Sequence, residues 1–195
     1  MTDAFANYLT QKGSLTPEEI RQVEQVIIPR KIRRYQYLLQ PGEVSNYIGF
    51  VVKGCLRQFR ISENGQEHIM RFAIENWWVS DFESFLSGQP SKSYIDALED
   101  SEIVMMEKQN YDILIQTIPN FKSLIDKLTT KNFEVHQARI YSNISESAED
   151  RYNNFIISYP SINQRVPLHM VASFLGLSRE TLSRVRKQDS RKNTD

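Results

Sequence analysis

The sequence predicts an α+β protein in which an N-terminal antiparallel β-barrel or jelly-roll β-roll is followed by a long helix and a C-terminal helix-turn-helix. Residues from about 35 to 108 form short segments rich in Val, Ile, Phe and Tyr, separated by turn pairs. From 118 to 144, apolar residues recur at three- and four-residue steps. The stretch VASFLGLSRETLSRVRK, residues 171–187, then joins an apolar run to a cluster of basic residues through a glycine and a serine.

Length and composition bound the class of protein. At 195 residues the chain can form one large or two small domains. We predict a β-roll part over 1–109, a long connecting and dimerisation helix over 110–146, and a helix-turn-helix part over 147–195. No apolar run is long enough for a signal peptide or a membrane span, so we expect a cytoplasmic protein without membrane contact. The single cysteine, Cys55, excludes an internal disulfide and a multi-thiolate metal site, and we expect no cofactor.

Charge is distributed unevenly along a chain whose formal net charge is zero. Residues 1–150 hold 16 Lys and Arg against 21 Asp and Glu, a net charge of −5. Residues 151–195 hold 8 against 3, a net charge of +5. A local positive field attracts polyanions whatever the total charge, so the C-terminal part is the candidate for contact with nucleic acid.

A first helix is predicted from Pro17. Thr16 is the expected N-cap, Pro17 occupies the first helical position and Glu19 completes a capping box. Leu15 and Ile20 are spaced as a hydrophobic staple.

A β-hairpin is predicted in ISENGQEHIMRFAI. The pair Asn64-Gly65 supplies the positive φ angles of a tight turn. His68, Met70, Phe72 and Ile74 follow in alternation with mostly polar neighbours, which predicts one strand face formed by these four side chains.

The periodic segment 118–144 predicts a long amphipathic helix with Pro119 near its start. The apolar residues of this helix form a stripe along it. The stripe can pack on the roll of the same chain or on the same helix of a second subunit, and both arrangements can hold at different ends of the helix. The stripe consists of Phe121, Leu124, Ile125, Leu128, Phe133, Val135, Ile140 and Ile144.

Three short helices are predicted after the long one. Ser147 can cap the first of these helices, and Asp150 can reach back to Ser147. Pro160 is expected to end this helix. Pro167 is expected at the start of the second, and Ser178 is a good N-cap for the third.

The segment 171–187 has the spacing of a helix-turn-helix. A small residue, Ala172, lets the two helices approach, Gly176 takes the left-handed turn, and Leu182 and Val185 face inward. A helix presented in this way can enter the major groove, where Arg donates to guanine and Glu accepts from cytosine. The alternative is a solvated amphipathic helix. The predicted DNA-binding residues are Ser178, Arg179, Glu180, Ser183, Arg184 and Lys187.

This segment resembles the DNA-reading unit of the Crp/Fnr family of bacterial transcription regulators, whose recognition helix commonly carries SRETVxR where this chain has SRETLSR. On that resemblance, Arg179, Glu180 and Arg184 match the base-contacting positions of the family. YIGFVVKGCLRQFRISENGQEHIM is similar to the hairpins of the family's cyclic-nucleotide-binding-like roll. The segment DFESFLSGQPSKSYIDALEDSEIV is placed like its small-ligand loop.

The chain departs from cyclic-nucleotide-binding members in that loop. Those members carry a Gly-Glu pair for the ribose and an Arg-Ser or Arg-Thr pair for the cyclic phosphate. Here Ser80-Asp81 and Ser91-Lys92-Ser93 stand at those places, so the bidentate arginine grip on phosphate is missing and we do not expect cyclic AMP to bind. The candidate effector pocket is Asp81, Phe82, Glu83, Ser84, Ser91, Lys92 and Ser93.

Aromatic residues crowd the same region. Trp77, Trp78, Phe82 and Phe85 can either line a pocket for another effector or pack the roll.

A second departure concerns the end of the chain. Family members usually continue into a two-stranded wing that touches the phosphate backbone, whereas only DSRKNTD follows Gln188. We therefore expect no full wing, with Arg191 and Lys192 as a tail that reaches phosphates; whether the wing is naturally absent or truncated is left open.

An enzyme is not expected. A metal-binding roll needs several converging histidines, whereas His68, His136 and His169 lie in three different segments. No nucleophile and base, phosphate loop or close carboxylate pair stands out. The acidic residues Asp96, Glu99, Asp100 and Glu102 are interpreted as a solvated strand end.

The predicted function is that of a sequence-specific DNA-binding transcription regulator of the Crp/Fnr type, which binds palindromic sites in double-stranded DNA as a homodimer. RNA polymerase and an unidentified small-molecule effector are left open as further partners. The alternative is a ligand-sensing or scaffolding β-roll module that does not read DNA.

Overall fold

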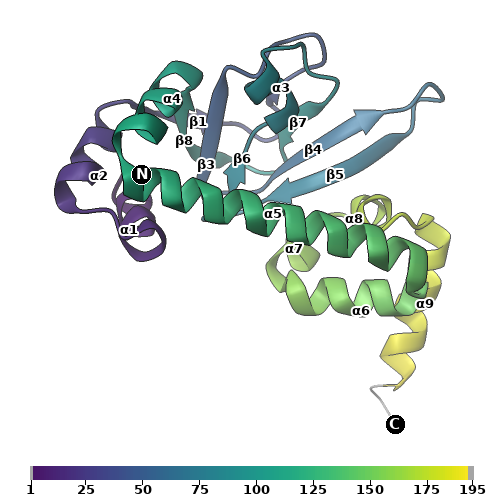
Figure 1. The fold of residues 1–195 in the computed structure, drawn as a ribbon. Helices are drawn as coiled ribbons and strands as arrows, with labels where there is room; N and C mark the ends of the chain where they lie inside the picture. Colours follow the sequence, from purple (N-terminus) through teal and green to yellow (C-terminus); the bar gives the residue numbers. More distant parts are fainter. Residues whose placement is uncertain (1, 193–195) are drawn as a thin grey trace.

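Two antiparallel sheets form the β-roll (Figure 1). The computed structural model of the chain describes residues 2–192, with side chains described up to 188. One sheet has the strand order β1-β8-β3-β6 and the other β2-β7-β4-β5, which confirms the α+β class and the roll. The strands are β1 (Ile27–Ile32), β2 (Tyr37–Leu39), β3 (Tyr47–Lys53), β4 (Leu56–Ile61), β5 (Glu67–Ala73), β6 (Trp78–Val79), β7 (Tyr94–Ala97) and β8 (Ser101–Glu107).

Aliphatic side chains from both sheets fill the interior of the roll, and Val51, Leu56, Ile95 and Ile103 are among those almost completely buried. Burial of such residues is the main stabilising contribution to a fold of this kind. The turn between β3 and β4 requires glycine, because a Cβ atom on Gly54 would lie 2.1 Å from the Ser101 hydroxyl and its φ is +114°.

Two helices precede the roll. The helix α2 (Pro17–Glu24) begins as the sequence predicts: Thr16 Oγ accepts from the Glu19 N–H, and the Glu19 carboxylate accepts from the Thr16 N–H. The helix α1 (Thr2–Gly13) was not among the predicted elements. It packs Phe5 and Leu9 into a cluster with β3 and the start of the long helix.

The hairpin β4–β5 is confirmed, but the predicted face of β5 is wrong. Ile69 is buried where His68 and Met70 are exposed, while Phe72 is buried as expected. The register of the two strands shifts between Gln58 and Phe59, so β5 has one extra residue there. Such a bulge changes which side chains face inward, and simple alternation cannot reveal it.

The segment 110–146, expected to hold one connecting helix, is divided between α4 (Lys108–Thr117) and α5 (Pro119–Ser145). Ile118 between them is extended, with φ −120° and ψ 97°. A proline disfavours helical backbone at the residue before it and suits the first position of a new helix. The predicted long helix is therefore α5. Figure 1 shows it running from the N-terminal helices to the C-terminal ones.

The C-terminal unit contains α6 (Ala148–Ser158), α7 (Pro160–Arg165), α8 (Leu168–Phe174) and α9 (Arg179–Lys192). Ser147 caps α6 as predicted, since its Oγ accepts from the Asp150 N–H at 3.1 Å. Pro160 was expected only to stop this helix, but it also starts α7. Within residues 2–192, none of the helices combines the length and the apolar composition needed to cross a lipid bilayer.

Candidate nucleic-acid interface

A tight turn at Gly176 sets the angle between α8 and α9. The φ of Gly176 is +66°, a left-handed conformation that glycine adopts without steric cost. The Leu177 N–H donates to the Ala172 carbonyl at 2.9 Å and closes the end of α8. Ala172, Leu182 and Val185 are buried between the helices, as the sequence predicts for a helix-turn-helix.

The helix α9 begins at a serine cap. Ser178 Oγ accepts from the Thr181 N–H at 3.1 Å. A hydrogen bond from its own backbone, with a further one from Ser178, lowers the pKa of Glu180 below its ordinary value of 4.5. This carboxylate is therefore ionised at neutral pH and can accept hydrogen bonds from a base edge.

The outward side of α9 is accessible. Arg179, Glu180, Arg184 and Lys187 are exposed, and Ser183 is half-buried at the edge of the same face. The structure thus brings the predicted DNA-binding residues onto the beginning and one side of a single helix, and none of them belongs to the buried cluster that this helix shares with the roll. Arg191 and Lys192, expected to contact phosphates, lie among the residues whose side chains are not described.

The helix-turn-helix is held on the outer face of the hairpin β4–β5. Phe59, Ile69 and Phe72 of the hairpin share a buried cluster with side chains of α6 to α9. Ser173 of α8 bonds the edge of β5 twice: its Oγ donates to the Glu67 carbonyl at 3.0 Å and accepts from the Ile69 N–H at 2.9 Å. The C-terminal unit therefore packs directly on the roll.

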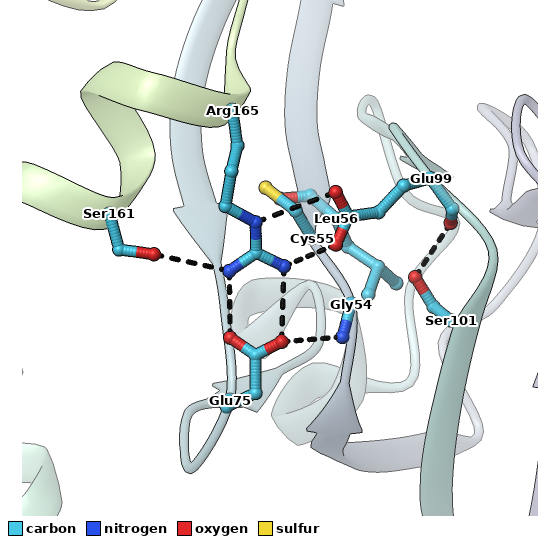
Figure 2. A network of polar contacts seen from close by, with 8 residues as sticks. All are labelled: Gly54, Cys55, Leu56, Glu75, Glu99, Ser101, Ser161 and Arg165. Atoms are coloured by element: carbon cyan, nitrogen blue, oxygen red, sulfur yellow. Dashed lines mark hydrogen bonds and ion pairs between the residues drawn. The ribbon is translucent and has the colours of Figure 1, made fainter.

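An ion-pair network reinforces this contact (Figure 2). Arg165 at the end of α7 pairs with Glu75 and with Glu99, which belong to two different connections of the roll. The Gly54 N–H donates to the Glu75 carboxylate at 2.7 Å. Burial tends to raise the pKa of Glu75, but the hydrogen bonds from Arg165 and Gly54 prevail and lower it below 4.5.

The interpretation of the acidic residues near the end of β7 as a solvated strand end is wrong for two of them. Asp96 is 2% exposed, and its carboxylate accepts two hydrogen bonds from the buried Arg57 guanidinium, at 2.8 and 3.0 Å. Glu99 pairs with Arg165. Their partners lie 39 and 66 residues away in sequence, so no local spacing indicated these pairs.

The expected effector segment forms a compact hydroxyl network. Asp81 caps the helix α3 (Phe82–Ser87) and accepts from Ser91 Oγ at 2.6 Å. Ser84 Oγ donates to the Gln89 carbonyl at 2.6 Å and accepts from the Ser45 N–H. These hydrogen bonds are made within the protein itself.

The other predicted members of the segment lie at different depths. Ser93 is buried and accepts from Arg60, whereas Glu83 and Lys92 are exposed. Phe82 is half-buried. Among the described residues, no group of three or more His, Cys, Asp or Glu side chains could hold a metal ion.

The long helix has two different halves. Phe121, Leu124 and Ile125 are buried against the roll and the N-terminal helices. Phe133, Ile140 and Ile144 are 63%, 55% and 81% exposed. Because residues three, four and seven apart share a helix face, these three form an apolar stripe without a partner in the described chain.

A β-roll joined through a long helix to a helix-turn-helix with an accessible second helix defines a regulator that combines a sensor-type domain with a DNA-binding unit. A model of the cyclic nucleotide-binding domain matches residues 29–117. The transcriptional activator protein anr of Pseudomonas aeruginosa is 23% identical over 88% of this chain and 75% of its own length. The fumarate and nitrate reduction regulatory protein of Vibrio cholerae is 26% identical over 94% of this chain and 77% of its own length. The chain is therefore similar to transcription regulators of the Crp/Fnr kind over most of its length.

Solved structures show the same fold. FixK2 from Bradyrhizobium japonicum superposes with a TM-score of 0.75 at 15% identity, with 86% of each chain covered. The catabolite activator protein of Thermus thermophilus superposes with a TM-score of 0.60 at 21% identity, with 95% of this chain and 88% of that one covered.

Proposed function

We propose that this regulator binds a palindromic DNA site as a homodimer and places the α9 helix of each subunit in the major groove. One observation carries the proposal. The helix α9 is capped by Ser178 and buries its apolar side, while its polar side is exposed. Dimers of such units bind two half-sites about one helical turn apart, and the symmetry of the site mirrors that of the protein.

The proposal gives each side chain of this face a role. Arg179 and Arg184 can donate two hydrogen bonds each to guanine, and Glu180 can accept one from cytosine. Ser178, Ser183 and Lys187 complete the surface next to the bases and phosphates. Each good bidentate contact with a base discriminates by about 1–3 kcal/mol.

The apolar stripe on the second half of α5 supports the dimer. Phe133, Ile140 and Ile144 lie on one side of α5, and pairing with the same helix of a second subunit would bury all three. The isologous contact would hold the two DNA-binding units at a fixed separation.

The three-part division is part of the proposal: 1–109 as a sensor, 110–146 for connection and dimerisation, and 147–195 for DNA binding. The hydroxyl groups of the expected effector segment already have partners within the protein: Ser84 donates to the Gln89 carbonyl, Ser91 donates to the Asp81 carboxylate, and Ser93 accepts from Arg60. This supports the expectation that cyclic AMP is not the effector. Contact with RNA polymerase and the cytoplasmic location stay predictions.

The alternative is a sensing or scaffolding module that does not read DNA, and selection from a random duplex pool separates the two. A DNA reader enriches a palindrome, and its affinity for that site falls steeply as salt rises because bound phosphates release counterions. A pool that yields no enriched sequence at low salt would favour the scaffold.

A further inference from the structure

A cavity of about 880 Å³ lies between the long helix α5, the strand β5 and the C-terminal helices. This volume falls in the range of small-molecule sites, roughly 300–1,000 Å³. Of the seven residues of the expected effector segment, only Phe82 lines it. The cavity is therefore separate from the hydroxyl network around Asp81.

Aromatic side chains form much of the wall. Both tryptophans of the chain are among them, and the lining is mainly apolar. The aromatic lining residues contributed by the roll and the C-terminal unit include Trp77, Trp78, Phe82, Phe155, Tyr159 and Phe174. Such a wall favours a ligand with an apolar body.

The charges of the lining are almost all positive. Its only carboxylate is Glu146, which accepts from two neutral donors, Ser142 at 2.6 Å and Asn154 at 3.1 Å. Six lining residues are lysines or arginines: Lys12, Arg71, Lys127, Lys131, Arg139 and Arg151. In a chain with zero net charge, this concentration of cations favours an anion.

The three arginines have only neutral partners among the described residues. Arg71 donates to the Asn132 side chain at 3.3 Å, and Arg139 donates to the Met70 carbonyl at 2.6 Å. Arg151 donates to the Leu175 carbonyl at 2.9 Å, while its buried Nε has no hydrogen-bond partner. Burial lowers the pKa of Arg71 and of Arg139, in agreement with the neutral character of their hydrogen-bond partners.

We infer that this cavity binds a small molecule with an anionic head group, carboxylate or phosphate, on an apolar body. The head group would lie between Arg71 and Arg139, and the body against Trp77 and Phe174. Arginine suits this role because its planar guanidinium can grip either anion with two parallel hydrogen bonds.

The site is compatible with the proposed dimer. Asn132 and Arg139 lie on a different side of α5 from the exposed stripe of Phe133, Ile140 and Ile144, as the helical period requires. A second subunit packed on the stripe would leave the cavity open.

The lining comes from all three parts of the chain. Arg71 belongs to the roll, Arg139 to the long helix and Phe174 to the helix-turn-helix. A ligand that contacts all three would connect the sensor part with the DNA-binding part. Its binding does not itself require that α9 read DNA, so a failure of one proposal leaves the other standing.

Tryptophan fluorescence of the full chain tests the inference directly, because both tryptophans line the cavity. Decanoate, decyl phosphate and decan-1-ol share one body and differ in the head group. We expect one of the two anions, or both, to bind at one molecule per chain and at least about tenfold more tightly than decan-1-ol. The tighter anion identifies the head group.

Variants of the two arginines test the assignment of the head group. The double substitution Arg71→Met with Arg139→Met should abolish the preference for an anion. Arg71→Lys should retain most of it. The matched control is Arg60→Met. The Arg60 guanidinium lies outside the cavity and pairs with Glu83, so this variant should bind the anions like the wild type.

Thermal unfolding followed by circular dichroism establishes that each variant is folded. The inference is overturned if decan-1-ol binds as tightly as both anions, if neither anion binds below roughly 1 mM, or if the folded double variant keeps the preference.

Discussion

Arg165 of α7 and Glu75 of the roll face each other as a two-pronged ion pair, with Nη1 2.7 Å from Oε2 and Nη2 3.0 Å from Oε1. These residues are 90 positions apart in sequence. The pair, together with Glu99, fixes the helix-turn-helix to the hairpin side of the roll (Figure 2). The docked arrangement leaves the exposed polar face of α9 in solvent.

Removing the guanidinium tests the contribution of this network to stability. Arg165→Gln should lower the free energy of unfolding by about 1 kcal/mol. The effect is no larger because Arg165, Glu75 and Glu99 are partly exposed and solvent screens their attraction. Urea denaturation of the wild type, Arg165→Gln, Glu75→Gln and the double variant gives the coupling energy. A coupling energy of zero would mean that the pair does not hold the two parts together.

The same network predicts a dependence on pH. Since the folded state lowers the pKa of Glu75, its contribution to stability is complete above the ordinary value of 4.5 and is lost as pH falls through the lower folded value. The difference in free energy of unfolding between the wild type and Glu75→Gln should be constant from pH 7 to about pH 5. It should shrink in more acidic solution. A difference that grows on acidification would contradict the assignment.

Cys55 provides a reporter of the contact between the roll and the helix-turn-helix. Burial raises the pKa of its thiol to about 12, and it lies in the apolar cluster shared by the two parts. At pH 8 only roughly one such thiol in ten thousand is ionised, and the thiolate is the reactive form. Modification by 5,5′-dithiobis(2-nitrobenzoic acid) should be at least about a hundredfold slower in the folded protein than in urea.

Arg165→Gln should accelerate this modification by loosening the contact above the thiol. Equal rates for the folded wild type and the urea-unfolded chain would show that Cys55 is accessible and that the parts are not docked as described.

A single charged substitution tests whether the exposed stripe of α5 forms the dimer interface. Ile144→Glu should shift the protein from dimer to monomer in sedimentation equilibrium, because an ionised carboxylate cannot be buried at a helix pair without a partner. Ile157→Glu is the matched control, since Ile157 is 77% exposed on α6 rather than on α5. A wild type that is monomeric at all concentrations, or an Ile144→Glu variant that dimerises like the wild type, would count against this interface.

The sequence anticipates the elements whose signals are local. Thr16, Ser147 and Ser178 each cap a helix as predicted, because a cap depends on residues only three positions apart. The left-handed turn at Gly176 and the polar face of α9 follow from the same short-range rules.

Long-range arrangements could not be predicted in this way. The partners of Asp96 and Glu99 lie in other strands and helices, so their burial or pairing depends on the folded topology. The bulge in β5 reversed the predicted orientation of Met70. The arginines of the cavity come from separate elements, and no motif in the sequence joins Arg71 to Arg139.

The central claim is that the exposed guanidinium groups of α9 read bases. The most direct measurement is the ratio of affinities for the selected palindrome and for a scrambled duplex, determined by fluorescence anisotropy at one salt concentration. The wild type should show a ratio of at least about a thousand. Arg184→Ala should reduce it by about tenfold or more while non-specific binding changes little. Arg33→Ala, which removes an exposed guanidinium from the roll, should leave it unchanged. An Arg184→Ala protein that retains the full ratio would contradict the account.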